Sequence, residues 1–597
     1  MSKPRRKAKL STGQVVKNME TKTCQNCKSK FVVEQEDFNF YEKIKVPPPT
    51  WCPECRLIRR MITFNVRNLY NRKCDNCNKK IISIFRSNSP YKVWCFDCYF
   101  SDKFNSLAYG NDYNFSLDFF TQYEQLRRNI PLLSLEQSGN NSGGCEYANY
   151  TYASKNIYLS HNVAKSEDVY YSVFVNRDNR MCFDSLSFRE DELCYEVVDS
   201  NHNYNCLYLT RSDLCIDSQF LFNCVNCQNC FMSSNQRNQN YVFRNKKLSK
   251  DEYEKMLENE NLTSYRSLKI LEEEYQKLMG NSIVSFARLV NAINCTGDII
   301  ENSKNCVSSF YIWKSENLKY VTYSVNALND SYDMLDSGRG ERMYESICSG
   351  RGNYEIAFCA RTFNAVQSYY CEGCIDVKNS FGCIGLRNKE YCILNKQYNK
   401  EEYEKLLPKI IKQMEEIPYV DKNNCKYKFG EFFPAEISPF AYNETMAYEQ
   451  FPLSKEEILS KNFKWQDDLD RSYNVTLKSS DIPDNIKDVS DKILGETIAC
   501  EHEGKCSHQC TRAFRIIPVE LQFYKRTNLP LPRICPNCRY FTRLKRALPW
   551  RLWHRTCMCE NTNHMHKGKC EEEFETPYSP ERPETVYCKK CYQQEVY

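Results

Sequence analysis

Paired cysteines at both ends of the chain constrain its fold more than any other feature. Near the N-terminus, four Cys-x2-Cys pairs are separated by 24, 18 and 17 residues. One such pair places two thiolates in a tight turn, and a second pair completes a tetrahedron around Zn2+. We predict two four-cysteine zinc sites built from neighbouring pairs, although alternating pairs would also satisfy the spacing. The ligands are Cys24, Cys27, Cys52, Cys55, Cys74, Cys77, Cys95 and Cys98.

The C-terminal end repeats this pattern. Cys52 corresponds to Cys535 and Cys55 to Cys538, an offset of 483 residues. The sequence therefore predicts a third zinc site formed by Cys506, Cys510, Cys535 and Cys538. Its first turn, CSHQC, is one residue longer than Cys-x2-Cys, so the first ligand stays open. The alternatives to Cys506 are Cys500, His502 and His508.

A fourth site follows from the last cysteine pair, which repeats the 17-residue spacing of the N-terminal module. Its predicted ligands are Cys557, Cys570, Cys588 and Cys591, which brings the expected content to about four Zn2+ ions. An insertion, CMCENTNHMHKGKC, contributes three more residues that suit a metal. They form part of an extra site, replace a ligand, or lie in a solvated loop: Cys559, His564 and His566.

The cysteine content favours metal binding over disulfides. The chain has 35 cysteines in 597 residues, which is far too long for a small disulfide-stabilised scaffold. The N-terminus lacks the apolar segment of a secretory signal, and no stretch reaches 18 apolar residues. We therefore expect a cytoplasmic location without membrane association, where reduced cysteines serve as metal ligands.

The stretch between the second and third cysteine pairs of each module is strongly basic. It contains six Lys or Arg residues and no acid in both copies. Arginine binds phosphate in a bidentate manner and aromatic side chains stack on unpaired bases, so these stretches suit RNA or single-stranded DNA. A basic helix face packed beneath the cysteines is the alternative. The candidate nucleic-acid contacts are Arg56, Arg60, Arg72 and the aligned Arg539, Arg543 and Arg555.

Charge is distributed unevenly along the chain. Residues 1–100 contain 21 Lys or Arg against 8 Asp or Glu, and residues 501–597 contain 17 against 11. Since the net charge is +6, the middle of the chain is acidic. Two basic ends suit a polyanion, whereas the acidic, tyrosine-rich middle suits a protein partner.

The middle of the chain contains a tandem duplication. Phe183-Asp184 recurs as Tyr332-Asp333 and Tyr195-Glu196 recurs as Tyr344-Glu345, an offset of 149 residues. Within each copy, short runs rich in Tyr, Phe, Val or Cys alternate with polar turns about every 12 residues. This spacing predicts a strand and a turn per unit, stacked as a parallel β-solenoid with cysteines and other small apolar residues in the core.

Each copy ends in a helix that begins with a capping box. The first box is Ser249 with Glu252, and the second is Asn399 with Glu402. We expect these helices to cover the exposed strand edges at the solenoid ends. Closely spaced cysteines such as Cys224, Cys227 and Cys230 are interpreted as core thiols, with a metal or iron–sulfur site as the alternative.

The predicted fold class is mixed but mainly β. A duplicated β-solenoid-like centre with capping helices is flanked at both ends by double zinc-ribbon or treble-clef modules. The predicted parts are a basic disordered tail (1–20), the N-terminal double zinc module (21–100), a connector (101–144), two repeat domains (145–280 and 281–418), an extended connector (419–499) and the C-terminal double zinc module (500–597).

Motifs of catalysis are missing from the sequence. It contains no P-loop, no Gly-x-Ser-x-Gly, no His-Glu-x2-His and no dinucleotide-binding glycine pattern. We therefore expect a non-enzymatic, zinc-binding protein that binds nucleic acid through its basic modules. The alternatives are a protein-interaction scaffold that uses the acidic body and an enzyme with an unrecognised site.

Several segments resemble a known group of proteins. They are PPPTWCPECRLIRRMITFNVRNLY, GCIGLRNKEYCILNKQYNKEEYEKL, SPFAYNETMAYEQFPLSKEEI and RPETVYCKKCYQQEVY. The chain is similar in them to uncharacterised cysteine-rich zinc-ribbon proteins of small-genome candidate-phyla bacteria. The resemblance implies zinc, a bacterial source and the same architecture along most of the chain, and it implies no particular activity.

Overall fold

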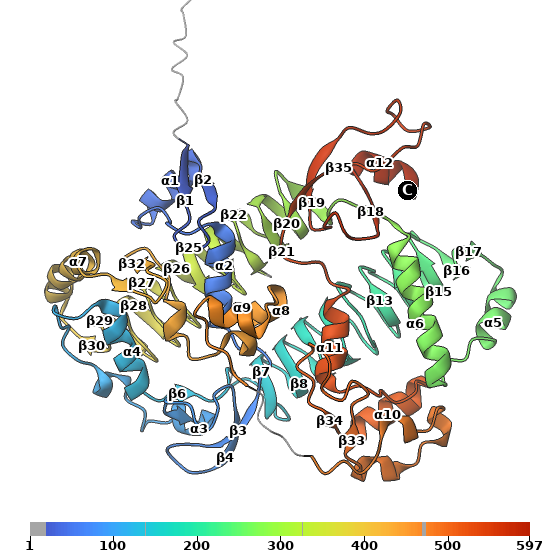
Figure 1. The fold of residues 1–597 in the computed structure, drawn as a ribbon, viewed down its shortest axis with the longest axis horizontal. Helices are drawn as coiled ribbons and strands as arrows, with labels where there is room; N and C mark the ends of the chain where they lie inside the picture. Colours follow the sequence, from blue (N-terminus) through green and yellow to red (C-terminus); the bar gives the residue numbers. More distant parts are fainter. Residues whose placement is uncertain (1–18, 138, 325, 468–472) are drawn as a thin grey trace, which may run out of the picture. The chain divides into compact units, whose positions relative to one another are not determined.

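The computed structural model describes residues 19–137, 139–324, 326–467 and 473–597 (Figure 1). The predicted tail, 1–20, therefore lies almost entirely outside the described residues. The fold is mainly β, and none of the helices in the described parts is long and apolar enough to cross a membrane.

Contacts along the chain divide it into two compact units. Unit 1 consists of Met1–Arg60, Leu107–Leu126 and Leu328–Ser438, and unit 2 consists of Met61–Ser106, Arg127–Ala327 and Pro439–Tyr597. The units cut across the second predicted repeat domain, because 281–327 belong to unit 2 and the following residues to unit 1.

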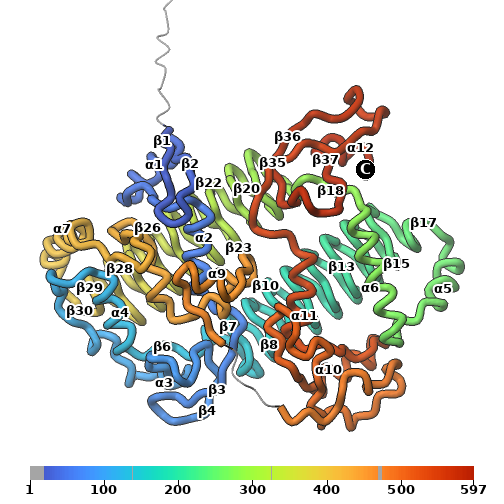
Figure 2. Tube along the Cα trace, viewed as in Figure 1, coloured from blue at the N-terminus to red at the C-terminus, as the bar shows by residue number. Residues whose placement is uncertain are grey.

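Unit 2 contains a stack of short parallel strands, which we call the first ladder. Residues 12 apart lie side by side, as Lys155 does with Glu167 and Leu207 with Gln219, so one coil of the chain takes 12 residues (Figure 2). The strands are β7 (Tyr147–Tyr152), β8 (Lys155–Ala164), β9 (Glu167–Tyr170), β10 (Val173–Asn176), β11 (Arg180–Phe183), β12 (Leu186–Arg189), β13 (Leu207–Thr210), β14 (Gln219–Phe222), β15 (Gln228–Ser234), β16 (Asn240–Phe243) and the antiparallel β17 (Lys246–Lys247).

Each coil turns a corner at every third residue. These corner residues have a positive φ although they are not glycines, as at Leu193 (56°), Glu196 (57°) and Asp199 (51°). This conformation is costly for residues with a Cβ. Hydrogen bonds between coils offset that cost, such as the one that the Leu193 amide donates to the Arg180 carbonyl at 3.0 Å.

The residue after each corner points into the coil, where little space is available. Small side chains fill this inner column, mostly Cys, Val and Ser. The inward serines satisfy their own polar groups: the Ser172 hydroxyl donates to the Tyr170 carbonyl and accepts from the Ser185 amide, both at 3.0 Å. Burial raises the pKa of the Cys206 thiol well above its usual range, so this cysteine stays protonated as a core residue.

A second series of parallel strands follows, and its strands belong to both units. Those in unit 2 are β19 (Leu289–Ile293), β20 (Gly297–Val307), β21 (Ser309–Trp313), β22 (Glu316–Lys319) and β23 (Thr322–Ser324). Those in unit 1, which we call the unit 1 ladder, are β24 (Leu328–Leu335), β25 (Gly340–Ile347), β26 (Asn353–Ala357), β27 (Val366–Tyr369), β28 (Ile375–Phe381), β29 (Arg387–Ile393) and the antiparallel β30 (Lys396–Gln397).

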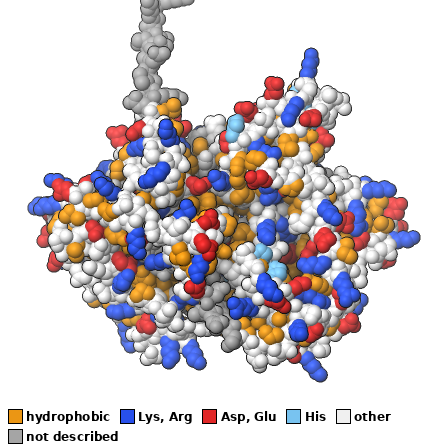
Figure 3. Space-filling model, in the orientation of Figure 1, with side chains coloured by type: hydrophobic (Ala, Val, Ile, Leu, Met, Phe, Trp, Pro, Cys, Tyr) orange, Lys and Arg blue, Asp and Glu red, His pale blue; other side chains and the backbone are white. Residues whose placement is uncertain are grey.

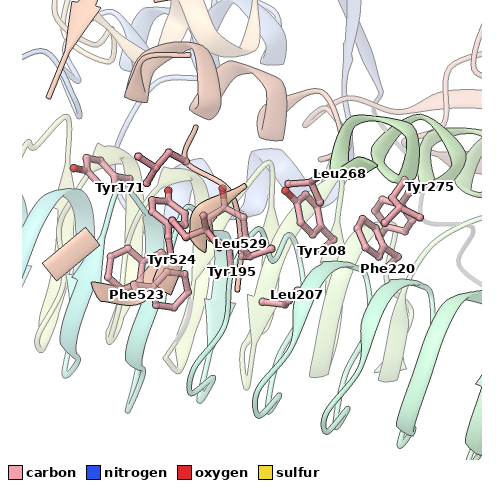
Figure 4. Packing of buried hydrophobic residues seen from close by; sticks show 14 of the residues in the cluster. Tyr171, Tyr195, Leu207, Tyr208, Phe220, Leu268, Tyr275, Phe523, Tyr524 and Leu529 are labelled. Carbon is pink, nitrogen blue, oxygen red and sulfur yellow. The ribbon is translucent and has the colours of Figure 1, made fainter. Parts of the chain in front are cut away.

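The predicted capping boxes are both present. Ser249 accepts from the Glu252 amide ahead of α5 (Lys250–Glu258), and Asn399 does so from Glu402 ahead of α7 (Lys400–Glu416). Helix α6 (Tyr265–Gly280) covers aromatic side chains of the first ladder, where Leu268 and Tyr275 lie beside Tyr208 and Phe220 (Figure 4).

The remaining elements belong to the cysteine modules and the connectors. In unit 1 they are β1 (Glu20–Thr23), β2 (Lys30–Val33), α1 (Gln35–Lys43), β31 (Tyr419–Val420) and β32 (Lys426–Tyr427), with α2 (Pro53–Met61) and α4 (Phe119–Asn129) beginning there. In unit 2 they are β3 (Tyr70–Lys73), β4 (Lys80–Ser83), β5 (Val93–Trp94), α3 (Phe96–Tyr99), β6 (Leu132–Leu133), β18 (Ile283–Ser285), α8 (Met446–Gln450), α9 (Lys455–Ser460), β33 (Ile498–Ala499), β34 (Ala513–Phe514), α10 (Pro518–Thr527), α11 (Pro536–Leu544), β35 (Trp553–Thr556), β36 (Glu573–Thr576), β37 (Thr585–Tyr587) and α12 (Lys589–Val596).

Candidate metal centres

The first four-cysteine group lies in unit 1. Hairpin β1–β2 carries Cys24 and Cys27 in its turn, and Cys52 and Cys55 lie at the start of α2. The sulfur atoms of these four cysteines all lie within 4.8 Å of one another. Four sulfurs bound to one zinc ion at about 2.3 Å would be about 3.8 Å apart. The distance of 3.6 Å between the Cys27 and Cys52 sulfurs agrees with that geometry.

The second group lies in unit 2 and repeats the arrangement of a hairpin turn and a helix start. The turn of hairpin β3–β4 provides Cys74 and Cys77, and the start of α3 provides Cys95 and Cys98. The Cys77 and Cys95 sulfurs are 3.8 Å apart. Neighbouring cysteine pairs therefore come together in both N-terminal groups.

The third group differs from the prediction in one ligand. The structure joins Cys510, Cys535 and Cys538 with Cys500, and not with Cys506. The reason is that Cys500 directly follows β33, which pairs with β34, and its sulfur accepts from the Cys535 amide at 3.2 Å, at the start of α11. Its sulfur lies 3.9 Å from that of Cys538. The longer CSHQC turn leaves Cys506 to one side, although it still contacts Cys538.

The fourth group has the predicted composition. Cys557 and Cys570 lie in the connection between β35 and β36, and Cys588 and Cys591 lie at the start of α12. The insertion holds a second contact: the Cys559 sulfur lies 3.1 Å from His564 Nδ1. His566 Nδ1 instead lies 2.8 Å from the Gly568 carbonyl oxygen, within its own loop.

The predicted nucleic-acid arginines of unit 1 are buried. Arg56 and Arg60, on α2, are 1% and 0% exposed, and both form ion pairs with Asp333 of the unit 1 ladder, at 2.8 and 3.2 Å. Arg60 also lies 3.3 Å from Glu345. The neighbouring Arg59 bonds both oxygens of Glu345, at 2.8 and 2.9 Å, and reaches Glu431 at 2.7 Å.

The same arrangement recurs in unit 2. Arg539 and Arg543, on α11, are 3% and 0% exposed and pair with Asp184 of the first ladder, at 2.7 and 2.6 Å. Arg543 also pairs with Glu196 at 3.0 Å. Arg546 forms a further ion pair with Glu196, and Arg539 reaches Glu520 of α10 at 3.1 Å.

These contacts contradict the assignment of phosphate contacts to Arg56, Arg60, Arg539 and Arg543. The duplication retains the four arginines because they join each cysteine module to the strands beneath it, and their guanidinium groups do not reach the surface. The two other candidates are also engaged: Arg72 pairs with Asp75 at 2.8 Å, and Arg555 donates to the carbonyl groups of Tyr578 and Ser579.

Aromatic side chains complete both interfaces. In unit 1, Phe40 of α1 stacks on Tyr332 with ring centres 3.9 Å apart. In unit 2, Phe523 of α10 stacks on Phe183 at 4.0 Å, and Tyr524 lies beside Tyr195 (Figure 4). Several tyrosines and carboxylates of the acidic repeats are therefore covered by the chain's own cysteine modules.

The carboxylates of each interface lie on adjacent coils. Phe183 and Tyr195 are neighbours in the first ladder, so Asp184 and Glu196 follow one another across the coils. Burial raises the pKa of Glu196, with a further increase from the Asp184 charge, although Arg543 and Arg546 oppose both effects. Glu345 in unit 1 has a raised pKa for the same reasons. The arginines are therefore needed to keep these carboxylates charged.

The sequence contained a signal for these partners. Asp184 and Asp333, like Glu196 and Glu345, occupy equivalent positions of the duplication. A carboxylate kept at a position that is otherwise apolar or aromatic, together with an arginine kept in another duplicated segment, indicates a buried ion pair. The partners Glu431 and Glu520 had no such signal, since neither lies in the tandem duplication that carries the other carboxylates.

No model of a protein family matches the chain, and a search of curated proteins likewise found no match.

Proposed function

We propose that the protein is a non-enzymatic scaffold in which Zn2+ ions hold two cysteine modules against β-solenoid domains. The observation that carries the proposal is the recurrence of one interface in both units, from ligand cysteines to arginines to ladder carboxylates. The zinc-ribbon or treble-clef class of the modules and the bacterial family described above belong to the same proposal.

Zinc fits the donor atoms. Each of the four groups offers four cysteine sulfurs within 4.8 Å of one another, and closed four-cysteine sites are typical of structural zinc. A catalytic zinc site keeps one coordination position open for water or substrate. Four cysteine ligands would fill all four positions, which favours a structural role.

The position of the arginines supports a structural role for the metal. Arg56 directly follows Cys55, and Arg539 directly follows Cys538. A metal ion that holds the start of α2 or α11 also sets the direction of that helix, and so delivers its arginines to the buried carboxylates. Loss of the ion would leave both partners of each pair without a fixed geometry.

Substitution of an exposed ligand tests this role. Cys27 is exposed, so Cys27→Ser removes almost no packing. We expect this variant to lose one zinc per chain, measured by elemental analysis, and to expose 24–60 to proteolysis. The matched control is Cys295→Ser, between β19 and β20 and outside the four-cysteine groups, where the sulfur contacts the backbone carbonyls of Ile293 and Ser303 and the amide of Cys306. Unchanged zinc content in Cys27→Ser would overturn the proposal.

Nucleic-acid binding is a second candidate, and it now rests on a different surface. A groove of about 690 Å3 beside the second cysteine group is lined by Lys79, Lys80, Phe96 and Tyr147, among others. Both lysines are exposed, and Tyr147 is 44% exposed. Lysines beside accessible aromatic rings suit the backbone and bases of a single strand. Asp97 and Glu146 also line the groove, and Asp97 lies 3.8 Å from Lys79. The face in Figure 3 likewise shows basic and acidic side chains interspersed.

Reversal of charge in the groove tests this candidate. We expect salt-dependent retention of the full chain on single-stranded nucleic acid, weakened by Lys79→Glu with Lys80→Glu. The control is Lys246→Glu with Lys247→Glu, an exposed pair with the same change in net charge. Equal retention of the two double variants would show that the groove is not the binding surface.

A further inference from the structure

The third cysteine group has more metal-binding side chains than one ion can use. Besides the four sulfurs of Cys500, Cys510, Cys535 and Cys538, a second cluster joins His502, Cys506 and His508 to the same Cys538. The donor atoms within each cluster all lie within 4.8 Å of one another. We propose that this module binds two zinc ions bridged by the Cys538 thiolate.

The sulfur separations fit a shared ligand. The Cys538 sulfur lies 3.9 Å from that of Cys500 and 3.7 Å from that of Cys506, so it belongs to both clusters. Both values match the separation of about 3.8 Å expected for thiolates on one zinc ion. A zinc ion bound by Cys500, Cys510, Cys535 and Cys538 already has four ligands. It therefore has no position left for Cys506.

The two histidines provide an independent indication. His508 is 9% exposed and its ring stacks on Phe541 with centres 5.6 Å apart. The Nδ1 atoms of His502 and His508 are buried and have no hydrogen-bond partner among the described residues. A buried ring nitrogen without a partner destabilises the folded state. A zinc ion bound to that nitrogen removes the cost, and one bound to the other ring nitrogen fixes the orientation of the ring.

The loop that carries these residues is folded tightly enough to collect them. Glu503 and Gln509 have positive φ values of 49° and 50°. The amide of Glu503 donates to the Cys500 carbonyl at 2.9 Å, and that of Lys505 to the His502 carbonyl at 2.7 Å. A β-turn of this kind reverses the chain between the first and second ligands, so residues from both arms face Cys538.

The first module shows what a single-ion version looks like. At the offset of 483 residues, Thr23 and Gln25 take the places of Cys506 and His508. The first group therefore lacks these additional donors. They also make the third group less negative. Two Zn2+ with five thiolates and two neutral imidazoles carry a formal charge of −1, whereas one Zn2+ with four thiolates carries −2.

Metal content of the full chain tests the bridge. We expect Cys506→Ser to lose one zinc per chain and Cys538→Ser to lose two, whereas His554→Ala, an exposed histidine paired with Glu573 and Glu575, loses none. His502→Ala with His508→Ala should lose one and keep the module folded, because the four-cysteine site remains. Equal losses from Cys506→Ser and Cys538→Ser would overturn the proposal.

Cadmium replacement gives a direct readout. In a chain loaded with 113Cd, two ions that share a thiolate show scalar coupling to each other. We expect one coupled pair of signals, which collapses to a single uncoupled signal in His502→Ala with His508→Ala. The inference rests on the proposed zinc scaffold, but the two fail differently: uncoupled signals from every site would refute only the bridge, and absence of bound metal would refute the scaffold.

Discussion

The two interfaces between cysteine module and strand ladder use the same number of charges with different members. In unit 1, Arg56, Arg59 and Arg60 face Asp333, Glu345 and Glu431. In unit 2, Arg539, Arg543 and Arg546 face Asp184, Glu196 and Glu520. Two arginines and two carboxylates correspond in each set, and the third member on each side does not.

The third members show how such an interface changes. Thr542 stands where Arg59 would be, and Arg546 takes over from beyond the helix. Glu520 corresponds to Asp37, which accepts from the Glu34 amide at 3.0 Å, at the start of α1. In unit 1, the connector supplies Glu431. An uncompensated buried charge is strongly destabilising, so the balance of three to three has been kept while individual partners changed.

Loss of a metal ligand should have the largest effect and should separate the two interfaces. Structural zinc sites contribute about 10 kcal/mol or more of apparent binding free energy. We expect Cys52→Ser to open 24–60 to limited proteolysis and Cys535→Ser to open 500–546, each leaving the other module protected. Cleavage of both modules in either variant would show that the interfaces are not independent.

Removal of a central arginine should cost less but act alike in both units. Arg60→Met and Arg543→Met each leave two buried carboxylates without a shared partner, which we expect to cost about 3–5 kcal/mol in chemical denaturation. Adding Asp333→Asn or Asp184→Asn should recover part of the loss in its own unit. If one of these arginine variants lost less than about 1 kcal/mol of unfolding free energy, the two interfaces would not be energetically equivalent.

The non-equivalent carboxylates offer a finer comparison. Glu431→Gln and Glu520→Gln each leave one excess positive charge in an interface. We expect each to cost about 2 kcal/mol, since both remove a charged hydrogen bond. Each carboxylate also accepts from a hydroxyl, Glu520 from Tyr171 at 2.8 Å and Glu431 from Thr50, so we expect the two substitutions to cost about the same. Denaturation midpoints of the two variants measure any difference.

The smallest expected effect concerns acid. All seven histidines of the chain belong to unit 2. Burial, with a smaller contribution from Arg67, lowers the pKa of His161 to about 3. Its neutral form is thus favoured in the folded state, and the stability it contributes is complete above pH 6.5 and lost as the pH falls towards 3. The loss should approach about 1.4 kcal/mol per pH unit.

A variant that lacks His161 isolates that effect from the protonation of metal-bound thiolates. In His161→Gln, the stability of unit 2 should fall less steeply between pH 6.5 and 5.5, while proteolysis of unit 1 should change as in the parent chain. The same pH slope in both proteins would show that His161 does not titrate between its folded and unfolded values.

The sequence predicted those parts of the molecule whose partners are close along the chain. Cysteine pairs in neighbouring turns and the capping box of Ser249 are local arrangements, and both occur in the structure. The partner of Arg539 is 355 residues away, so no spacing could identify it. The duplication correctly marked the arginine as important, but retention alone does not distinguish a surface contact from a buried one.

The corner at every third residue of the coil could not be predicted from the sequence, for another reason. Positive φ values usually signal glycine, yet Tyr171, Phe174 and Arg177 occupy these corners. The 12-residue period was visible because side chains repeat from coil to coil. The shorter period was not, because the inward positions alternate between serine, cysteine and aliphatic residues that no single hydrophobicity pattern describes.

The pairing of early segments with late ones affects how the protein is made. As the chain leaves the ribosome, the first ladder is complete long before Arg539 and Arg543 are translated. Asp184 and Glu196 therefore lack these arginine partners during more than half of synthesis. The N-terminal module waits in turn for Asp333 and Glu345. Early zinc loading would keep this module ordered during the delay, so metal supply during translation, as well as afterwards, should govern the yield of folded protein.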